Sequence, residues 1–273
     1  MKLAVVGHVE WVEFVRVDHV PEAGEIVTAL ETWEEAAGGG AVAAVQLANL
    51  AGSAQLFTSL GADEHGARAR EQLTRAGVTV HAAAAREPQR RAFTYVDGDG
   101  ERTITVLGRK LVPSGQDATL PWEELARCDA AFFVSGDIAA LEAARRARVL
   151  VATTRELATL RRAGVEVDVL VGSGGDPSER YDMGTLDPPP GVVVTTAGPL
   201  GGWVNPGGPF RAAALPGPIE DAYGCGDCFA AGLTFSLAHG RPMEDALVLA
   251  ARCGAAVLTG RGAYAGQLTA ATV

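Results

Sequence analysis

Short apolar runs alternate along the chain with longer stretches in which apolar residues recur every three or four positions. The short runs are typical of buried strands, and the longer stretches are typical of amphipathic helices. Their alternation predicts βαβ units, and therefore an α/β fold with a largely parallel sheet covered by helices on both faces. The expected strands are Leu3–Val6, Ala54–Ser59, Ala130–Val134, Val149–Ala152, Val167–Val171 and Val192–Thr196. The expected helices are Ala41–Leu50, Gly66–Ala76, Ile138–Ala147, Glu156–Ala163, Asp227–His239 and Met243–Thr259.

Two regions do not follow this alternation of strand and helix patterns. The segments of about 9–32 and 90–107 each hold two stretches of alternating polar and apolar residues, separated by turn residues such as Pro21 and Gly24. This pattern is typical of antiparallel hairpins with one exposed face. We therefore expect the two hairpins to pair as a small β-sheet lid over a cleft, within a single domain of residues 1–273.

Composition and charge narrow the function. The chain has 273 residues, 48% of them hydrophobic, and a net charge of −10. Nonspecific binding to nucleic acid or to an anionic membrane needs a basic surface, so neither partner is expected. The sequence also has no uninterrupted apolar stretch of about 18 residues, and it starts with a short apolar run unlike a signal peptide. We expect a cytoplasmic protein.

The segment DAYGCGDCFAAG, from Asp221 to Gly232, holds the strongest chemical signal. A glycine-rich turn that enters a helix points several backbone N–H groups at one place, where the helix dipole also favours an anion. Asp227, in the first helical turn, would lie beside a bound phosphate and could accept the proton of an attacking hydroxyl. Alternatively, Asp227 only caps the helix.

Four further motifs occur with this loop in a fixed order. With them, the sequence resembles the ribokinase-like (PfkB-type) carbohydrate kinase family over nearly its whole length. The resemblance implies a doubly wound α/β core with a β lid, and transfer of phosphate from MgATP to a hydroxymethyl group of a sugar or related alcohol. The four motifs are VVG at 5–7 with PEAGE at 21–25, GGG at 38–40, SLGADEHG at 59–66 and VVTTAGPLGG at 193–202.

The resemblance also assigns roles to residues of the loop. It makes Asp227 the general base, and the N–H groups of Gly224, Cys225 and Gly226 an anion hole. Asp221 matches a residue that in many members binds a monovalent cation, so K⁺ is a possible cofactor. Ala222 stands where the family usually has threonine.

Nucleotide and metal contacts are implied along the second half of the chain. The segment from Ser173 to Asp176 matches the family's Asn-x-x-Glu, which organises Mg²⁺ and phosphates. Asp176 keeps the carboxylate, whereas serine replaces the asparagine. The nucleotide contacts expected from the resemblance are Ser173, Asp176, Thr196, Gly198, Gly201 and Gly262.

The acceptor side of the cleft departs from the family pattern. The usual substrate-binding aspartate falls on Val12, and strand alternation makes Glu10 the replacement on the same face. The usual asparagine falls near Val42 or Ala43, both apolar. A sugar ring needs many hydrogen-bond partners, so the acceptor need not be a common hexose or ribose.

Arg109 and Asp137 are two further candidate contacts to the acceptor. Arg109 could bind an anionic group, or be part of an exposed basic turn. Asp137 follows an expected strand, and in open α/β sheets that edge faces the ligand crevice. The substrate residues expected from motif and position are Glu10, Gly38, Gly39, Arg109 and Asp137.

Three hypotheses about function follow. The first is an ATP-dependent kinase that uses Asp227 as its base, with Mg²⁺ and a homodimer through the lid. The second is a nucleotide- or metabolite-binding homologue with little or no turnover, suggested by the losses at Val12, Val42 and Ser173. The third is a thiol–disulfide switch between Cys225 and Cys228, for which the competing interpretation is two small filler residues.

Overall fold

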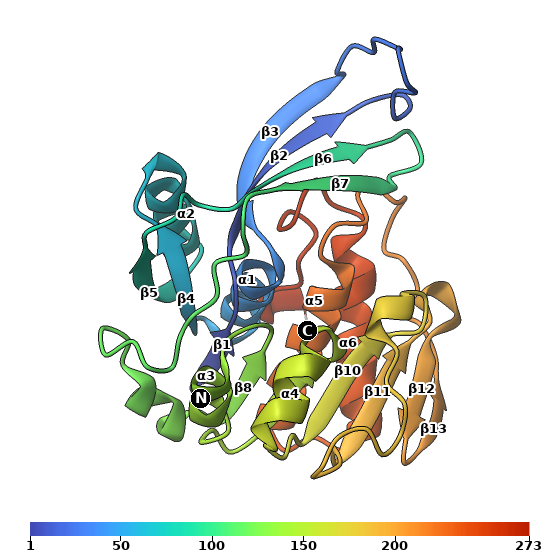
Figure 1. Ribbon diagram of the computed structural model, residues 1–273. Helices are drawn as coiled ribbons and strands as arrows, with labels where there is room; N and C mark the ends of the chain where they lie inside the picture. The colour runs from blue at the N-terminus through green and yellow to red at the C-terminus, as the bar shows by residue number, and fades with distance from the viewer. Residues whose placement is uncertain (273) are drawn as a thin grey trace.

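Nine strands form one twisted sheet, shown in Figure 1. The computed structural model describes residues 1–272. The strands of this sheet are β1 (Leu3–Val6), β4 (Ala54–Gly61), β5 (Val78–Ala85), β8 (Ala130–Phe133), β9 (Leu150–Thr153), β10 (Val169–Ser173), β11 (Val192–Thr196), β12 (Gly202–Asn205) and β13 (Gly208–Phe210). Their order is β13-β12-β11-β10-β9-β8-β1-β4-β5. The pairs from β5 to β11 are parallel, and β12 and β13 extend the sheet antiparallel, so the predicted mostly parallel α/β fold is confirmed.

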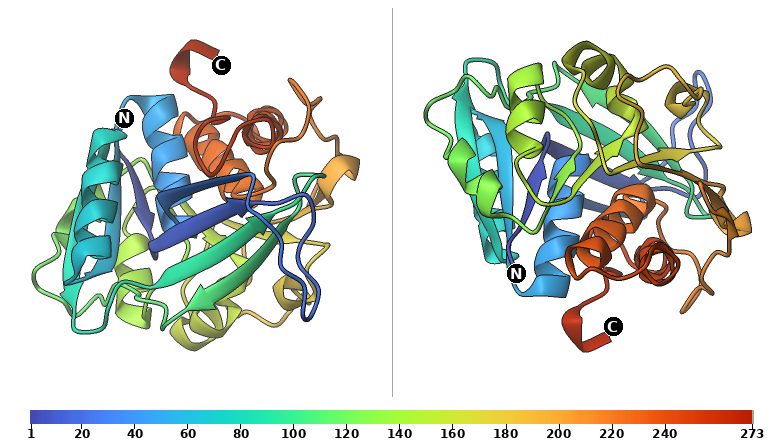
Figure 2. Two further views of the ribbon diagram at one scale, coloured as in Figure 1. Left: turned by 90° about the horizontal axis from the view of Figure 1, so that it is seen from above. Right: turned by 90° about the horizontal axis from the view of Figure 1, so that it is seen from below.

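Helices cover both faces of this sheet, as the right-hand view in Figure 2, seen from below, also shows. Along β1, Leu3 and Val5 pack into one buried cluster, whereas Ala4 and Val6 pack into the other, because successive side chains point to opposite faces. The first face carries α1 (Gly39–Ala51), α5 (Cys225–Ala238) and α6 (Met243–Val257). The second carries α3 (Ile138–Ala144) and α4 (Leu157–Ala163). The other helices are α2 (Glu64–Arg75), which contacts β4 and β5, and short 3₁₀ turns at Trp122–Arg127, Thr154–Glu156, Pro177–Glu179, Gly198–Leu200 and Ala270–Thr272.

A separate four-stranded sheet lies above the carboxyl ends of the parallel strands (Figure 1). Its strands are β2 (Glu10–Arg16), β3 (Glu31–Ala37), β6 (Arg91–Val96) and β7 (Arg102–Leu107), in the order β3-β2-β6-β7. The two predicted hairpins are present, β2 with β3 and β6 with β7, and they join through a parallel β2–β6 pair. We call this four-stranded sheet the lid.

The return strand of the first hairpin lies later in the chain than its sequence pattern indicates. The alternation at 25–32 predicts a strand there, but β3 spans Glu31–Ala37, and Ile26 is 97% exposed. The register is determined by Trp33, which stacks on Phe14 of β2 with ring centroids 4.9 Å apart. The buried Ala36 and Ala37 then lead directly into the turn at Gly38. Strands β5, β12 and β13 were also absent from the expected set.

None of the helices in residues 1–272 combines the length and the apolar character needed to cross a membrane.

Candidate active site

The glycine-rich loop enters α5 below the lid, at the carboxyl edge of the parallel sheet (Figure 1). Gly224 is the residue before the helix, and its φ of 80° is a left-handed conformation that favours glycine. A side chain there would also meet Val42 Cγ1 at 2.8 Å. The first α5 residue whose N–H bonds the preceding turn is Cys228, which donates to Gly224 O. The earlier N–H groups, those of Cys225 and Gly226 included, therefore point out of the helix end toward the cleft.

Asp227 lies in the first turn of α5, and its carboxylate contacts the turn before α1. A Cβ atom on Gly39 would lie 2.8 Å from Asp227 Oδ1. Burial raises the pKa of Asp227 to about 6, against the opposing effect of Arg155 and Arg102. With that pKa, about nine-tenths of the carboxylates are ionised at pH 7, and the group is close to the best basicity for proton transfer.

A second polar group lies across the Gly38–Gly39 turn from Asp227. Glu10, at the start of β2, is nearly buried, and its Oε1 lies 3.1 Å from Arg90 Nε and 3.8 Å from His8 Nε2. A Cβ atom on Gly38 would lie 3.1 Å from Glu10 Cγ. Burial raises the pKa of Glu10, and Arg90 and Lys110 oppose that rise. The predicted residues Glu10, Gly38 and Gly39 thus lie around the same turn as Asp227.

Two residues near Asp227 were not singled out from the sequence: Arg155, after β9, and Glu179, after β10. Glu179 is 8% exposed and accepts hydrogen bonds from Arg155 Nε at 2.7 Å and from Ser173 N at 2.9 Å. This pair joins the ends of two neighbouring strands. Arg155 lowers the pKa of Asp227 and Glu179 raises it, so both lie within electrostatic reach of the carboxylate.

The predicted metal carboxylate, Asp176, lies on the same side but in a more exposed turn. One of its oxygens accepts hydrogen bonds from the N–H and hydroxyl of Ser178, at 2.9 and 2.7 Å. The other lies 3.6 Å from Arg155 Nη2. Asp176 therefore keeps one oxygen that is not committed to the turn, whereas Glu179 is bound on both.

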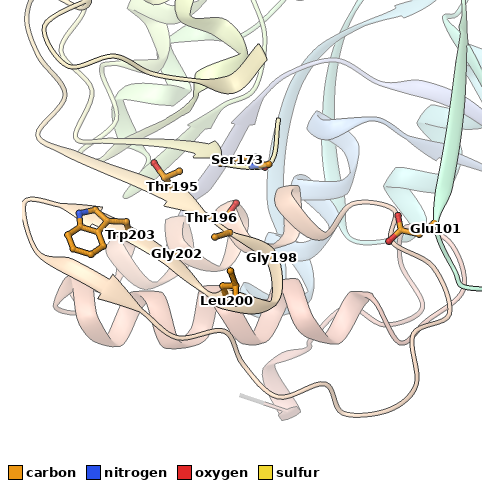
Figure 3. Close-up of a pocket in the computed structure, with 11 residues that line it drawn as sticks. Glu101, Ser173, Thr195, Thr196, Gly198, Leu200, Gly202 and Trp203 are labelled. Atoms are coloured by element: carbon orange, nitrogen blue, oxygen red, sulfur yellow. The ribbon is translucent and has the colours of Figure 1, made fainter. Parts of the chain in front are cut away.

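A cleft of about 1000 Å³ opens beside the ends of β10 and β11. Figure 3 shows Ser173, Thr196 and Gly198 in its wall, with Trp203 at one end and Glu101 of the lid hairpin at the other. Gly201 lies between two lining residues, Leu200 and Gly202. The nucleotide contacts expected at Ser173, Thr196, Gly198 and Gly201 are therefore gathered along one elongated cleft. Its length and its backbone-rich wall suit a nucleotide.

The expected cation residue, Asp221, is fully buried at the start of the loop. Its Oδ1 accepts from Tyr223 N at 2.8 Å and its Oδ2 from Gly262 N at 3.1 Å. Burial raises the pKa of Asp221. Gly262 thus supports the loop through Asp221. Among residues 1–272, no three histidine, cysteine, aspartate or glutamate side chains cluster as a metal site.

Two of the expected substrate residues have other contacts. Arg109 is 81% exposed and lies 3.5 Å from Glu87. Asp137 caps α3 by accepting from Ala140 N at 2.8 Å, and it also accepts from Ser114 Oγ at 2.6 Å and Gly115 N at 2.9 Å. These positions give no support to a substrate role for either residue, and both roles stay predictions.

The two loop cysteines do not have the environment of reactive thiols. Cys228 is fully buried, and its Sγ lies 3.4 Å from Gln267 Nε2. Burial raises the pKa of both Cys225 and Cys228, whereas a redox switch at this helix start requires a lowered thiol pKa. The geometry favours the interpretation of both as small filler residues.

Comparisons with known proteins agree with this arrangement. A model of the pfkB family of carbohydrate kinases matches residues 1–171 and 185–270. An ATP-dependent ribose-1-phosphate kinase from Halopiger xanaduensis is 30% identical over 292 residues, covering 94% of this chain and 92% of that protein. Among solved structures, a putative ribokinase from Agrobacterium tumefaciens has a TM-score of 0.82 at 20% identity, covering 99% of this chain and 95% of that one. A ribokinase from Thermotoga maritima has a TM-score of 0.78 at 19% identity, covering 100% and 97%.

Proposed function

Because the chain belongs to the pfkB family of carbohydrate kinases, we propose that it transfers phosphate from ATP to a hydroxymethyl group of a sugar or sugar-like molecule, with Asp227 as general base. One observation carries the proposal. The carboxylate of Asp227, with a pKa of about 6, lies beside the N-terminal N–H groups of α5 and faces the Gly38–Gly39 turn under the lid.

The roles of the residues follow from their positions. Asp227 takes the proton of the acceptor hydroxyl as its oxygen attacks the γ-phosphorus of ATP in line. The free N–H groups of Cys225 and Gly226, with the dipole of α5, stabilise the negative charge on the transferred group. Gly224 allows the close approach of the phosphate to this helix end. Arg155, held by Glu179, adds a positive charge within electrostatic reach of Asp227.

Mg²⁺ and K⁺ belong to the same proposal. Asp176, with one oxygen free of the turn, would hold Mg²⁺ through water, and a bound Mg²⁺ would neutralise charge on the phosphates. Asp221 would border a K⁺ site, although both of its oxygens already accept backbone hydrogen bonds. A homodimer through the lid also stays a prediction.

A second candidate function is nucleotide binding without turnover. It is favoured by the apolar, fully buried Val12 and Val42 on the acceptor side and by Ser173 in place of the family's asparagine. The pKa of Asp227 argues for the kinase, since a carboxylate that served only as a helix cap would gain from a lowered pKa rather than a raised one.

The test is an ADP-release screen over sugars, sugar phosphates, nucleosides and sugar acids. Ribose 1-phosphate is the first acceptor to try, because the Halopiger xanaduensis relative is named as a ribose-1-phosphate kinase. Asp227→Asn should retain ATP binding and lose turnover by at least about a thousandfold. Turnover at the wild-type rate in this variant would refute the role of Asp227, and ATP binding with no acceptor turned over would favour the second candidate.

A further inference from the structure

Arg90 contacts Glu10, and Lys110 lies within electrostatic reach of both His8 and Glu10. Arg90, just before β6, is 14% exposed and contacts Glu10 through Nε. Lys110, after β7, lies 3.4 Å from Glu156 and is 38% exposed. Burial, followed by the positive charges of Lys110 and Arg90, lowers the pKa of His8 to about 3, so both cations act on the same corner.

The guanidinium of Arg90 has unused hydrogen-bonding capacity. Within residues 1–272 it makes no hydrogen bond, and the 3.1 Å contact with Glu10 involves only its Nε. A guanidinium has five N–H donors, and a nearly buried one without partners is costly. The edge formed by its two terminal nitrogens is left for a ligand oxygen, while Glu10 occupies the Nε side.

The Gly38–Gly39 turn connects this corner to Asp227. Gly39 borders the carboxylate of Asp227, and its neighbour Gly38 borders Glu10 and His8. Because the two glycines are consecutive, with Cα atoms about 3.8 Å apart, Asp227 and the Glu10 corner border adjacent residues of one turn. A ligand bound between them would present one end to Asp227 and the other to Arg90.

The positions expected to bind a neutral sugar offer it no side-chain hydrogen bond in this chain. Val12, Val42 and Ala43 are fully buried and have no polar side-chain atoms. These are the positions at which the sequence pattern places the usual hydrogen-bonding residues for a neutral sugar. The binding free energy of the acceptor must then come from other contacts. At this corner, Arg90 and Lys110 can donate hydrogen bonds, and both are cationic.

We propose that the acceptor is a sugar phosphate whose existing phosphate binds Arg90 and Lys110 while its hydroxymethyl group faces Asp227. Arg90 supplies a forked donor pair that matches phosphate geometry, and Lys110 adds a point charge. In the reaction, the acceptor oxygen forms a bond to the γ-phosphorus, and the bond from that phosphorus to the β–γ bridging oxygen breaks. The hydroxyl proton goes to Asp227, and the products are ADP and a sugar bisphosphate. The inference rests on the kinase function proposed above.

The test measures binding separately from turnover. Ribose 1-phosphate has its hydroxymethyl group and its phosphate at opposite ends of a pentose, so it is the probe, with ribose and gluconate as neutral and carboxylate comparisons. Calorimetry on the wild-type protein should give at least about tenfold tighter binding of ribose 1-phosphate than of either comparison. Arg90→Gln and Lys110→Met should each weaken ribose 1-phosphate binding about 10- to 100-fold and change ribose binding less than about twofold.

Arg86→Gln is the matched control, because Arg86 is an exposed arginine four positions from Arg90 and its loss changes the net charge equally. It should leave all three affinities unchanged. If Arg90→Gln is poorly folded because Glu10 loses its cation, Lys110→Met and the double variant Glu10→Gln/Arg90→Gln carry the test. Equal binding of ribose and ribose 1-phosphate, tighter binding of gluconate, or unchanged ribose 1-phosphate binding in folded variants would overturn the proposal.

The binding and turnover results separate the two proposals. If the wild-type protein releases ADP with neutral sugars and does not prefer the phosphate, the phosphate subsite is wrong and the kinase function stands. If ribose 1-phosphate binds through Arg90 and Lys110 but no ADP forms with any acceptor, the subsite stands and the kinase function is wrong.

Discussion

Replacing Arg155 with methionine should move the acid limb of the kcat/KM profile to higher pH. Burial raises the pKa of Asp227 to about 6, and Arg155 is the first of two cations that oppose this rise. Without that positive charge the ionised carboxylate loses stabilisation, so its pKa rises further. A base that must be ionised to act is then active only at higher pH.

The size of the effect follows from the wild-type pKa. With a pKa of about 6, the base is about nine-tenths ionised at pH 7 and about one-tenth ionised at pH 5, so kcat/KM should fall about tenfold per unit below pH 6. Each further unit of rise in pKa lowers the ionised fraction on the acid limb about tenfold. The loss of Arg155 can also lower the plateau at high pH, but that change does not alter the position of the limb.

The assay is direct quantification of ADP from pH 4.5 to 9, a range chosen to be about 1.5 units below and 3 above the pKa. ATP and the acceptor titrate identically with both proteins, so a difference between the two profiles belongs to the protein. Arg146→Met, at an exposed arginine after α3, is the control and should keep the wild-type profile. An acid limb that stays in place or moves to lower pH in Arg155→Met would refute the electrostatic coupling to Asp227.

Two other predictions use the same carboxylate. Gly39→Ala places a methyl group 2.8 Å from Asp227 Oδ1, so kcat should fall about 100-fold while circular dichroism shows an intact fold. Gly217→Ala is the control and should keep the wild-type activity, because its added Cβ meets nothing closer than 3.8 Å. Asp227→Asn should raise the free energy of unfolding by about 1–3 kcal/mol at pH 7, because the fold no longer buries an ionised group whose pKa it raises. This gain should be complete above the folded pKa of about 6 and fade as the pH falls toward 3.8; a thermal-denaturation gain that is absent at pH 7, or largest at pH 4, would contradict it.

The residues found from the sequence are those whose role depends on local structure. A glycine-rich turn before a helix exposes the same N–H groups in any fold, so the start of α5 and Asp227 could be proposed as a phosphate site without coordinates. The alternating pattern also predicted the parallel sheet and the existence of a lid. Arg155 and Glu179 could not be found in this way, since they meet only because β9 and β10 are neighbours in the sheet.

The same limit explains the wrong position of the return strand in the lid and the missed carboxylate near the metal motif. The resemblance pointed to Asp176, which stays a prediction, and gave no sign of Glu179, the buried carboxylate that accepts from Ser173 N three residues later. The alternation at 25–32 resembled a strand, but the return strand is set by Trp33, through its stacking on Phe14. In both cases the deciding contact joins segments whose proximity the local pattern does not encode.

Direct contacts join the lid to the glycine-rich loop before α5. The guanidinium of Arg102, on β7, donates to Ala222 O and lies over the ring of Tyr223 at 5.6 Å, and Ala222 N donates to Gly100 O at 3.0 Å. The Tyr223 hydroxyl in turn accepts from Gly38 N at 3.2 Å. The tip of the lid hairpin cannot be displaced without breaking these bonds or moving the residues that lead into the anion hole. The position of the lid over the acceptor and the geometry around Asp227 are therefore coupled through Tyr223, which contacts both.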